Sequence, residues 1–267
     1  DELKGLVFRD IVSTPKIRHT SGYDYKYAQK IDDELKGQDS ELSINIITPF
    51  HEDTDNETAL SMNSMSTDEL LVILPSNSRF MSDLMLYKRT EKYVRQNQRT
   101  GLDEVKSRIL NEKGSQNSER SRTLKTRLQS MMSQATFIVR GETIEMREGD
   151  AKSRIERAFQ ILIEKVYSNL SMLRGVTYTE SDIAKYYTDA KDGMFVGGSA
   201  PLTEAEQQIF NHIQSQSKLS VRVTLKSVEE KFERKSFGWS THAILANVAR
   251  LCGSHKLEAT NDSNQLL

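Results

Sequence analysis

The chain has 267 residues, with 37 Lys and Arg against 38 Asp and Glu, so its formal net charge is −1. Hydrophobic residues make up 36 %, below the roughly 45–50 % of ordinary globular chains, but clear apolar runs and the small net charge exclude a disordered chain. The longest apolar run, residues 70–74, is far short of the ~20 residues of a membrane span. The single cysteine, Cys252, excludes an internal disulfide framework and a cysteine-based zinc site, and favours the cytoplasm.

The charges are distributed unevenly along the chain. Residues 1–78 carry 7 basic and 15 acidic side chains, whereas residues 79–127 carry 13 basic and 6 acidic ones. Either these adjacent blocks face each other, or the basic block serves an outside polyanion. The chain begins at Asp1 and has no signal peptide, so we expect a piece cut from a larger cytoplasmic protein.

The first 78 residues predict a mixture of strands and helix. Residues 5–12 are typical of a short extended piece, and apolar residues at spacing four predict an amphipathic helix over residues 23–35. Residues 42–46 alternate apolar and polar, which predicts a strand. Residues 70–74 predict a strand buried on both faces. The polar residues 51–68 predict a long loop.

Residues 79–134 have a helical pattern that predicts two antiparallel helices, a helical hairpin. The pattern breaks at residues 113–117, and the Thr100-Gly101 pair marks a further interruption. Strands follow at residues 136–140 and 143–146, and then a helix extends to about residue 173.

The C-terminal part predicts a different module. Residues 175–201 read as a helix that begins after Thr179 and then a glycine-rich linker. Seven elements then follow in the order of a winged helix. They are a helix (203–213), a strand (221–225), two helices (228–233 and 240–252), a strand (257–260), a turn (261–264) and a strand (265–267).

The resulting expectation is an α+β fold. A mixed α/β unit comprises residues 1–78 and 136–174, with the basic helical hairpin, residues 79–135, inserted into it. A helix and linker at 175–201 lead to a winged-helix-like module at 202–267.

The sequence lacks motifs that bind nucleotides or carry out hydrolysis. A P-loop requires Gly-x-x-x-x-Gly-Lys-Ser/Thr, and the glycine-rich stretch at residues 193–198 has no lysine. Residues 51–57 gather hard oxygen ligands, but a calcium loop counted from Asp53 would need Gly and Glu where Thr58 and Ser64 stand. There is no Gly-x-Ser-x-Gly elbow, and the histidines lack zinc-ligand spacing. We therefore expect no catalytic, cofactor-binding or metal-binding residue in this chain.

Basic residues concentrate on the predicted hairpin. Steps of four, three and four place one set on a single helix face, and the second helix adds another set. Such a ridge could grip nucleic-acid phosphates, or it is a solvated face, or it meets the acidic block. The candidate residues are Lys88, Lys92, Arg95 and Arg99 on the first helix, and Arg120, Arg122, Lys125 and Arg127 on the second.

The predicted recognition helix, residues 240–252, is the second candidate surface. Asn and Arg side chains can read base edges. Residues 202–267, however, carry 8 basic and 7 acidic side chains, which is weak for a DNA-binding module, so docking of a protein partner or a scaffold role is the alternative. The polar residues predicted to be exposed on this helix are Thr241, His242, Asn247 and Arg250.

Several stretches of the sequence resemble a known family. In the last third these are residues 202–206, 223–227, 237–239 and 243–245, and further upstream residues 71–75, Phe80, 91–93 and 149–173. They are similar to the BrxC family of BREX bacteriophage-defence ATPases, which is related to PglY.

The resemblance implies a very large cytoplasmic protein with an AAA-type P-loop domain, in a multi-protein system that blocks phage DNA replication and methylates host DNA. ATP and magnesium would bind elsewhere in the parent protein, because this chain has no matching motif. The implied partners are other subunits of the defence system, with double-stranded DNA and a second copy of the chain as further candidates and no membrane partner.

The resulting hypothesis is a non-catalytic interaction region of a phage-defence ATPase. The alternatives are a fragment of a transcription regulator whose winged helix reads an operator, and an enzyme whose site the sequence does not reveal. An operator reader should lose about 1–3 kcal/mol of binding free energy per mismatched base pair. A scaffold that grips phosphates should not discriminate.

Overall fold

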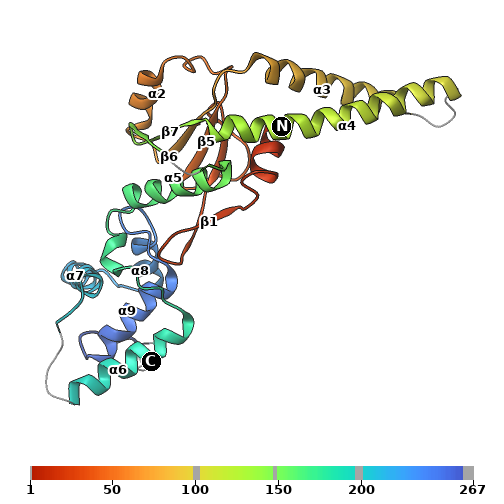
Figure 1. Ribbon diagram of the computed structural model, residues 1–267. Helices are drawn as coiled ribbons and strands as arrows, with labels where there is room; N and C mark the ends of the chain where they lie inside the picture. The colour runs from red at the N-terminus through yellow and green to blue at the C-terminus, as the bar shows by residue number, and fades with distance from the viewer. Residues whose placement is uncertain (1, 99–102, 147–148, 196–200, 261–267) are drawn as a thin grey trace. The chain divides into compact units, whose positions relative to one another are not determined.

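The computed structural model describes residues 2–98, 103–146, 149–195 and 201–260 (Figure 1). The chain forms two compact units. Unit 1 comprises Asp1–Ile17 and Tyr25–Leu162, and unit 2 comprises Arg18–Asp24 and Ile163–Leu267. Within the described residues, every helix is too short or too polar to cross a membrane.

A six-stranded mixed sheet forms the core of unit 1. The three strands β3, β5 and β6 are parallel, and the other neighbours pair antiparallel. A separate two-stranded sheet joins β1 (Lys16–Arg18) to β2 (Asp24–Lys26). The order of the six strands is β4 (Glu34–Leu35), β3 (Ala28–Ile31), β5 (Ser43–Ile47), β6 (Glu69–Ile73), β7 (Thr136–Val139) and β8 (Glu142–Ile144).

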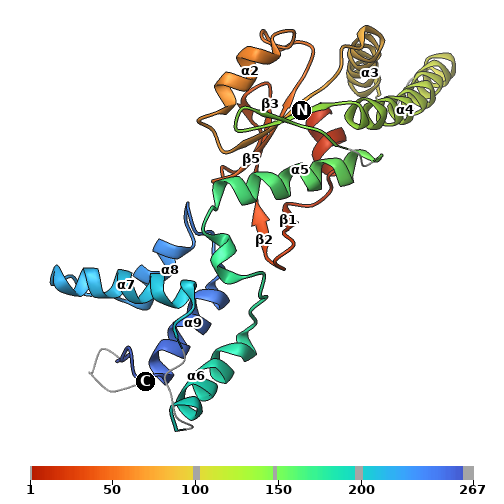
Figure 2. The ribbon, with the colours of Figure 1, turned by 60° about the vertical axis from the view of Figure 1, so that its left-hand side comes forward.

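The two predicted apolar strands are confirmed as the buried centre of this sheet. Ile44 and Ile46 on β5, and Leu70 and Val72 on β6, are fully buried. Full burial of such a side chain contributes about 1.5–3 kcal/mol to folding. Helices cover the sheet: α2 (Glu57–Ser64) packs against β7, and α5 (Ala151–Val166) is drawn on the other side of the sheet (Figure 2).

Three predictions in the first 68 residues are wrong. Residues 5–12 are not extended, because α1 (Glu2–Lys4) runs into a π-helical segment, η1 (Gly5–Arg9). Residues 51–68 are not one loop, since they contain α2, whose N-terminus is capped by the Asn56 side chain. Residues 23–35 form strands instead of a helix. A spacing of four also matches the two-residue period of a strand, and pairing with β5 decides the outcome.

The turn between β3 and β4 explains how this segment reverses. Asp32 and Asp33 have φ values of 49° and 65°, and Ile31 pairs with Glu34 across the turn. Two consecutive residues with positive φ are required by a type I′ hairpin turn, and Asp tolerates that conformation better than most residues.

The predicted helical hairpin is confirmed. Helix α3 (Ser78–Asn97) starts at Asn77, whose side chain accepts a hydrogen bond from the Phe80 amide at 2.9 Å. Helix α4 (Glu104–Ser133) is continuous, so the break predicted at residues 113–117 is wrong. Buried Asn117 instead donates to the Tyr87 carbonyl at 3.1 Å and joins the two helices. The interruption predicted at Thr100-Gly101 lies outside the described residues.

The end of the hairpin returns directly into the sheet. β7 and β8 confirm the predicted strand pair, with a turn at Arg140 and Gly141. Helix α5 ends at Val166 and not near residue 173, where a short 3₁₀ helix (Leu170–Leu173) follows.

Unit 2 is built around four helices. Phe232 stacks on Trp239 with ring centroids 5.0 Å apart, Phe237 packs edge-on against both rings, and Trp239 donates to the Asn169 carbonyl at 3.1 Å. Thr203 and Glu206 form a capping box at the start of α7. The helices are α6 (Glu180–Phe195), α7 (Glu204–Lys218), α8 (Leu225–Phe232) and α9 (Thr241–Gly253).

The strand predicted at residues 221–225 is wrong, because residues 221–224 have no strand pairing and Thr224 caps α8. Thr260 forms an isolated β-bridge at the end of the predicted wing strand. The predicted wing turn, its return strand at 265–267 and most of the linker before α7 lie outside the described residues.

Arg154 is a buried cation that secures the base of the hairpin. Its guanidinium donates to the carbonyls of Met132 and Ala135, at 3.4 and 3.0 Å, and lies 4.9 Å above the Phe137 ring. We predict that Arg154→Met lowers the free energy of unfolding of unit 1 by about 2–4 kcal/mol, because the Met132 and Ala135 carbonyls lose the hydrogen bonds from the buried guanidinium. Urea unfolding followed by circular dichroism measures the change. Arg157→Met, at an exposed position of the same helix, is the control and should change little.

Candidate functional site

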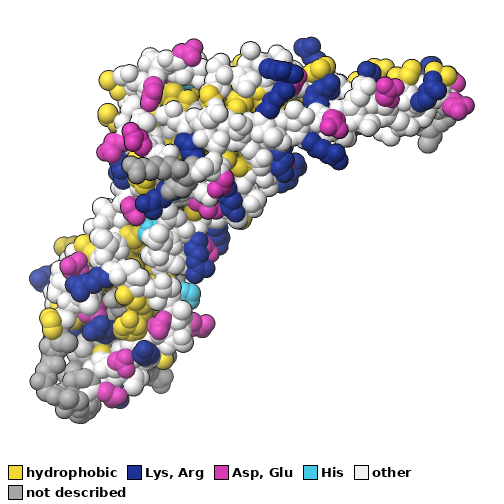
Figure 3. Space-filling model, in the orientation of Figure 1, with side chains coloured by type: hydrophobic (Ala, Val, Ile, Leu, Met, Phe, Trp, Pro, Cys, Tyr) yellow, Lys and Arg dark blue, Asp and Glu magenta, His cyan; other side chains and the backbone are white. Residues whose placement is uncertain are grey.

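A polar groove of about 520 Å³ runs between α3 and α4. Three cations line it: Arg95 from α3, and Arg122 and Lys125 from α4. Two carboxylates, those of Glu91 and Asp10, also line it. Figure 3 shows Lys and Arg side chains along the hairpin and its base. The groove therefore combines a helical scaffold with a net surplus of positive charge.

The four cations predicted on the first helix do not act alike. Lys88 pairs with Glu91 at 2.9 Å, one turn along the same helix. Lys92 is exposed, and Arg95 lines the groove. Arg99 lies outside the described residues. Arg95 is thus the member of the predicted ridge that the structure brings to the groove.

The four cations predicted on the second helix divide into two kinds. Arg120 donates to the Asn117 side chain at 2.9 Å, and Arg127 forms an ion pair with Asp83 of α3. Arg127 therefore joins the two helices, whereas Arg120 stays within α4 and contacts the Asn117 side chain that donates to Tyr87 of α3. Arg122 and Lys125 face the groove instead, and Lys125 lies 3.9 Å from Asp10. The spacing of these cations along the sequence does not separate those with partners inside the hairpin from those at the groove. The difference depends on which side chains lie opposite each cation.

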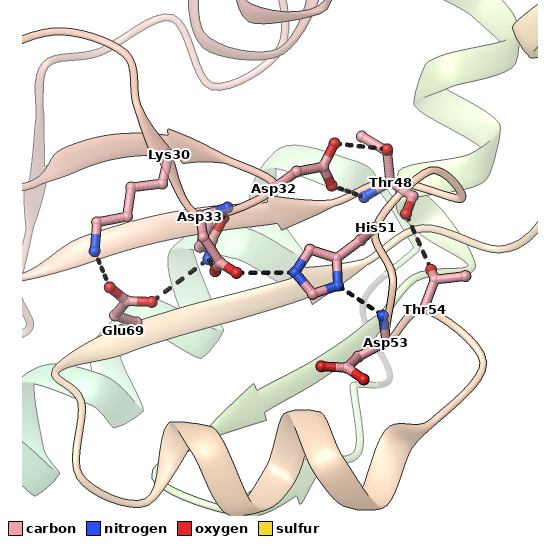
Figure 4. A network of polar contacts seen from close by, with 9 residues as sticks. Lys30, Asp32, Asp33, Thr48, His51, Asp53, Thr54 and Glu69 are labelled. Atoms are coloured by element: carbon pink, nitrogen blue, oxygen red, sulfur yellow. Dashed lines mark hydrogen bonds and ion pairs between the residues drawn. The ribbon is translucent and has the colours of Figure 1, made fainter.

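A second polar cluster lies where the parallel strands of unit 1 end (Figure 4). His51 Nε2 lies 2.8 Å from Asp33 Oδ2, and His51 Nδ1 accepts from the Asp53 amide at 3.1 Å. The fully buried Asn45 donates to the other oxygen of Asp33 at 2.7 Å. Asp32 accepts two hydrogen bonds from Thr48, at 2.7 and 2.8 Å. Sequence reasoning missed this cluster because it predicted a helix through Asp32 and Asp33.

This cluster joins the turn after β3 to β5 and to the segment that follows β5. Both nitrogens of the His51 ring are occupied, so neither is available to a substrate. Burial acts to raise the pKa of Asp33, but the hydrogen bonds from His51 and Asn45 outweigh it and hold that pKa below its ordinary value. The hydrogen bond to Asp33 raises the pKa of His51. Across the described ranges no group of three or more His, Cys, Asp or Glu side chains is placed to hold a metal ion.

Of the four polar residues that the sequence predicted to be exposed on α9, His242 is exposed, Thr241 and Arg250 are partly exposed, and Asn247 is buried. Asn247 is buried; its side chain donates to the Ala243 carbonyl at 2.7 Å and hydrogen-bonds with Tyr178. Arg250 Nε lies 3.0 Å from Oε1 of buried Glu206. Thr241 donates to Glu233 at 2.7 Å.

Several elements of unit 2 account for this difference. Asn247 meets Tyr178, which precedes α6, Arg250 meets Glu206 of α7, and Thr241 meets Glu233 at the end of α8. Helix α6 also packs along α9 so closely that a Cβ added at Gly253 would lie 2.3 Å from the Tyr187 carbonyl oxygen. The residues of α9 that are not buried are of mixed character: Thr241, His242, Leu245, Ala249, Arg250 and Cys252.

Comparison with known families identifies the two units. Residues 1–162 match a family model described as the BREX ATP-binding protein BrxC 4th domain with six-stranded beta sheet. The chain belongs to the BrxC family. Residues 169–267 match its winged helix-turn-helix domain. No solved structure matches the chain.

These matches confirm the family resemblance and the predicted fold class. The six-stranded sheet of the fourth BrxC domain is the sheet described for unit 1. The last match confirms an α+β unit followed by a winged helix. Both matches are to BrxC domains of a BREX system, and neither describes an operator-binding regulator.

The Asp33–His51 pair should make the stability of unit 1 depend on pH. His51 has a raised pKa, so its contribution is present below pH 6.5 and is lost as pH rises through the raised value. Asp33 has a lowered pKa, so its contribution is present above pH 3.8 and is lost as pH falls through the lowered value.

We therefore predict that His51→Gln destabilises unit 1 more at about pH 5 than at about pH 8. Urea unfolding at the two pH values measures this. Equal destabilisation at both values would show that the charge on His51 contributes nothing.

The Arg250–Glu206 contact predicts a role for Arg250 in folding. Arg250→Ala leaves the buried Glu206 carboxylate without this cation, so we expect unit 2 to lose about 1.5–3 kcal/mol of unfolding free energy. The fluorescence of Trp239, the single tryptophan, reports on unit 2 alone. Exposed Arg234→Ala is the matched control. An unchanged unfolding curve for Arg250→Ala would contradict the assignment.

Proposed function

We propose that this part of BrxC is a non-catalytic interaction region that binds the phosphate backbone of nucleic acid through the hairpin groove. The observation that carries the proposal is the position of Arg95, Arg122 and Lys125 around one groove between two helices. Phosphate contacts from Arg and Lys position a protein on nucleic acid but carry no sequence information. The proposed binding is therefore non-specific.

The winged helix supports a different task. Base readout needs exposed side chains that present hydrogen-bonding groups in a groove of DNA. Asn247, Arg250 and Thr241 are all engaged by partners within unit 2. We propose that this module docks other subunits of the defence system and does not read an operator.

The reaction chemistry of the parent protein belongs outside this chain in our proposal. The sequence has no P-loop, so ATP and magnesium would bind in another part of BrxC. The protein would act in the cytoplasm, and this region of BrxC would contribute contacts with DNA and with partner subunits.

Removal of the groove cations tests the proposal. We predict that the triple variant Arg95→Ala, Arg122→Ala, Lys125→Ala weakens binding to a short DNA duplex and reduces the slope of log K against log salt by about 2–3. Fluorescence anisotropy across a salt series measures both quantities. The control triple, Lys106→Ala, Arg108→Ala, Lys113→Ala, removes the same charge from α4 outside the residues that line the groove.

The same assay separates the proposal from the operator-reading alternative. Duplexes of unrelated sequence should bind with equal affinity. A duplex preference that survives removal of the groove cations, or equal loss in both triple variants, would contradict a phosphate-binding groove.

A further inference from the structure

The hairpin has an apolar face that points away from the groove. Tyr93 follows Glu91 of the groove by two residues, which places it about 200° around α3. Met85, Leu86 and Tyr93 are 50, 47 and 55 % exposed, and they recur at steps of seven and eight. This spacing places them on one side of the helix.

Helix α4 adds to this exposed apolar surface. Val105 and Ile109, four residues apart, are 53 and 47 % exposed. On α3 the exposed Arg89 lies four residues before Tyr93. On α4 Arg108 precedes Ile109, and the exposed charges of residues 103–113 are balanced between Lys106, Arg108 and Lys113 and Asp103, Glu104 and Glu112. Contiguous exposed apolar side chains with a polar border are typical of a protein interaction site.

A second exposed apolar surface in unit 1 has the opposite charge. Phe50, Met62 and Met65 are 60, 63 and 61 % exposed. The segment that contains them, residues 50–65, holds four acidic residues and no Lys or Arg. Figure 3 shows hydrophobic and acidic side chains together at the end of unit 1 where α2 lies. The exposed carboxylates Glu52 and Asp55 lie between Phe50 and α2 in the chain.

The two surfaces cannot meet within one molecule. Figures 1 and 2 both show the hairpin projecting from one side of unit 1, with α2 on the other side of the sheet's strands. Both belong to the same compact unit. The apolar side chains of α3 lie among exposed cations, Arg89 and Lys92, and those of the α2 surface lie among carboxylates, so the two surfaces are complementary between copies. Contacts of this kind are heterologous and generate rings or filaments.

We propose that a second copy of this chain is the occupant: the outer face of the hairpin of one copy docks on the α2 surface of the next. Apolar contact between Tyr93 and the exposed methionines supplies the centre of the interface. Charge pairing of Arg89 and Arg108 with Glu52 and Asp55 sets its direction. The interface uses the face of the hairpin opposite to the groove, so it is independent of the proposed nucleic-acid contact.

A charge-swap experiment with the 267-residue chain tests this proposal. One variant carries Arg89→Glu and Arg108→Glu, and the other carries Glu52→Lys and Asp55→Lys. Sedimentation velocity over a concentration series, without nucleic acid, should show wild-type oligomers that weaken with salt. Each variant alone should associate at least 10-fold more weakly, and an equimolar mixture of the two should recover association.

Two control variants and one further test variant complete the experiment. Arg234→Glu with Lys226→Glu makes the same charge change on unit 2 and should leave association unchanged. The groove triple variant should also associate normally. Tyr93→Ser should weaken association by removing the apolar centre. A wild-type chain that is monomeric at every concentration, a mixture that fails to associate, or loss of association in the groove triple would overturn the proposal.

Discussion

The pairing of β6 with β7 is the constraint on which unit 1 depends. The hairpin is inserted between these two strands, which are adjacent and antiparallel in the sheet, with Ile73 opposite Thr136. Its two helices therefore start and end at neighbouring points of a buried scaffold. Arg154 adds a second restraint at the C-terminal end of α4. Because the first and last residues of the hairpin are both fixed at its base, the groove has one defined geometry.

Some cations of the hairpin form contacts within it, and others lie at its groove. Arg127 and Arg120 are used within the hairpin, and Lys88 pairs along α3. Arg95 and Arg122 remain at the groove. The predicted acidic block contributes Asp10 at the edge of the same groove. An exposed ion pair such as Lys125–Asp10 contributes little to stability, and the groove cations are the side chains that we propose to meet an external anion.

The sequence predicted the elements that have a strong hydrophobic pattern. Its predictions were wrong where contacts with residues far away in the chain determine the local structure. Residues 70–74 were predicted correctly because a short continuous apolar run is typical of a buried strand, and residues 42–46 because their apolar and polar alternation matches the period of a strand. The segment at residues 23–35 failed because its spacing fits both a helix and a strand, and the choice depends on β5. The exposure of Asn247 was predicted wrongly for a similar reason, because its burial depends on partners such as Tyr178 that lie far from it in the sequence. The groove was predicted in part, since periodicity places Arg95 on a helix face but does not reveal Arg122 across from it.

Amide hydrogen exchange with and without a short DNA duplex tests the central claim most directly. The claim is that the hairpin groove, and not the recognition helix of the winged helix, contacts nucleic acid. The duplex should slow exchange in peptides that cover residues 91–98 and 114–125, and should leave residues 241–253 unchanged. Protection confined to residues 241–253 would contradict the account.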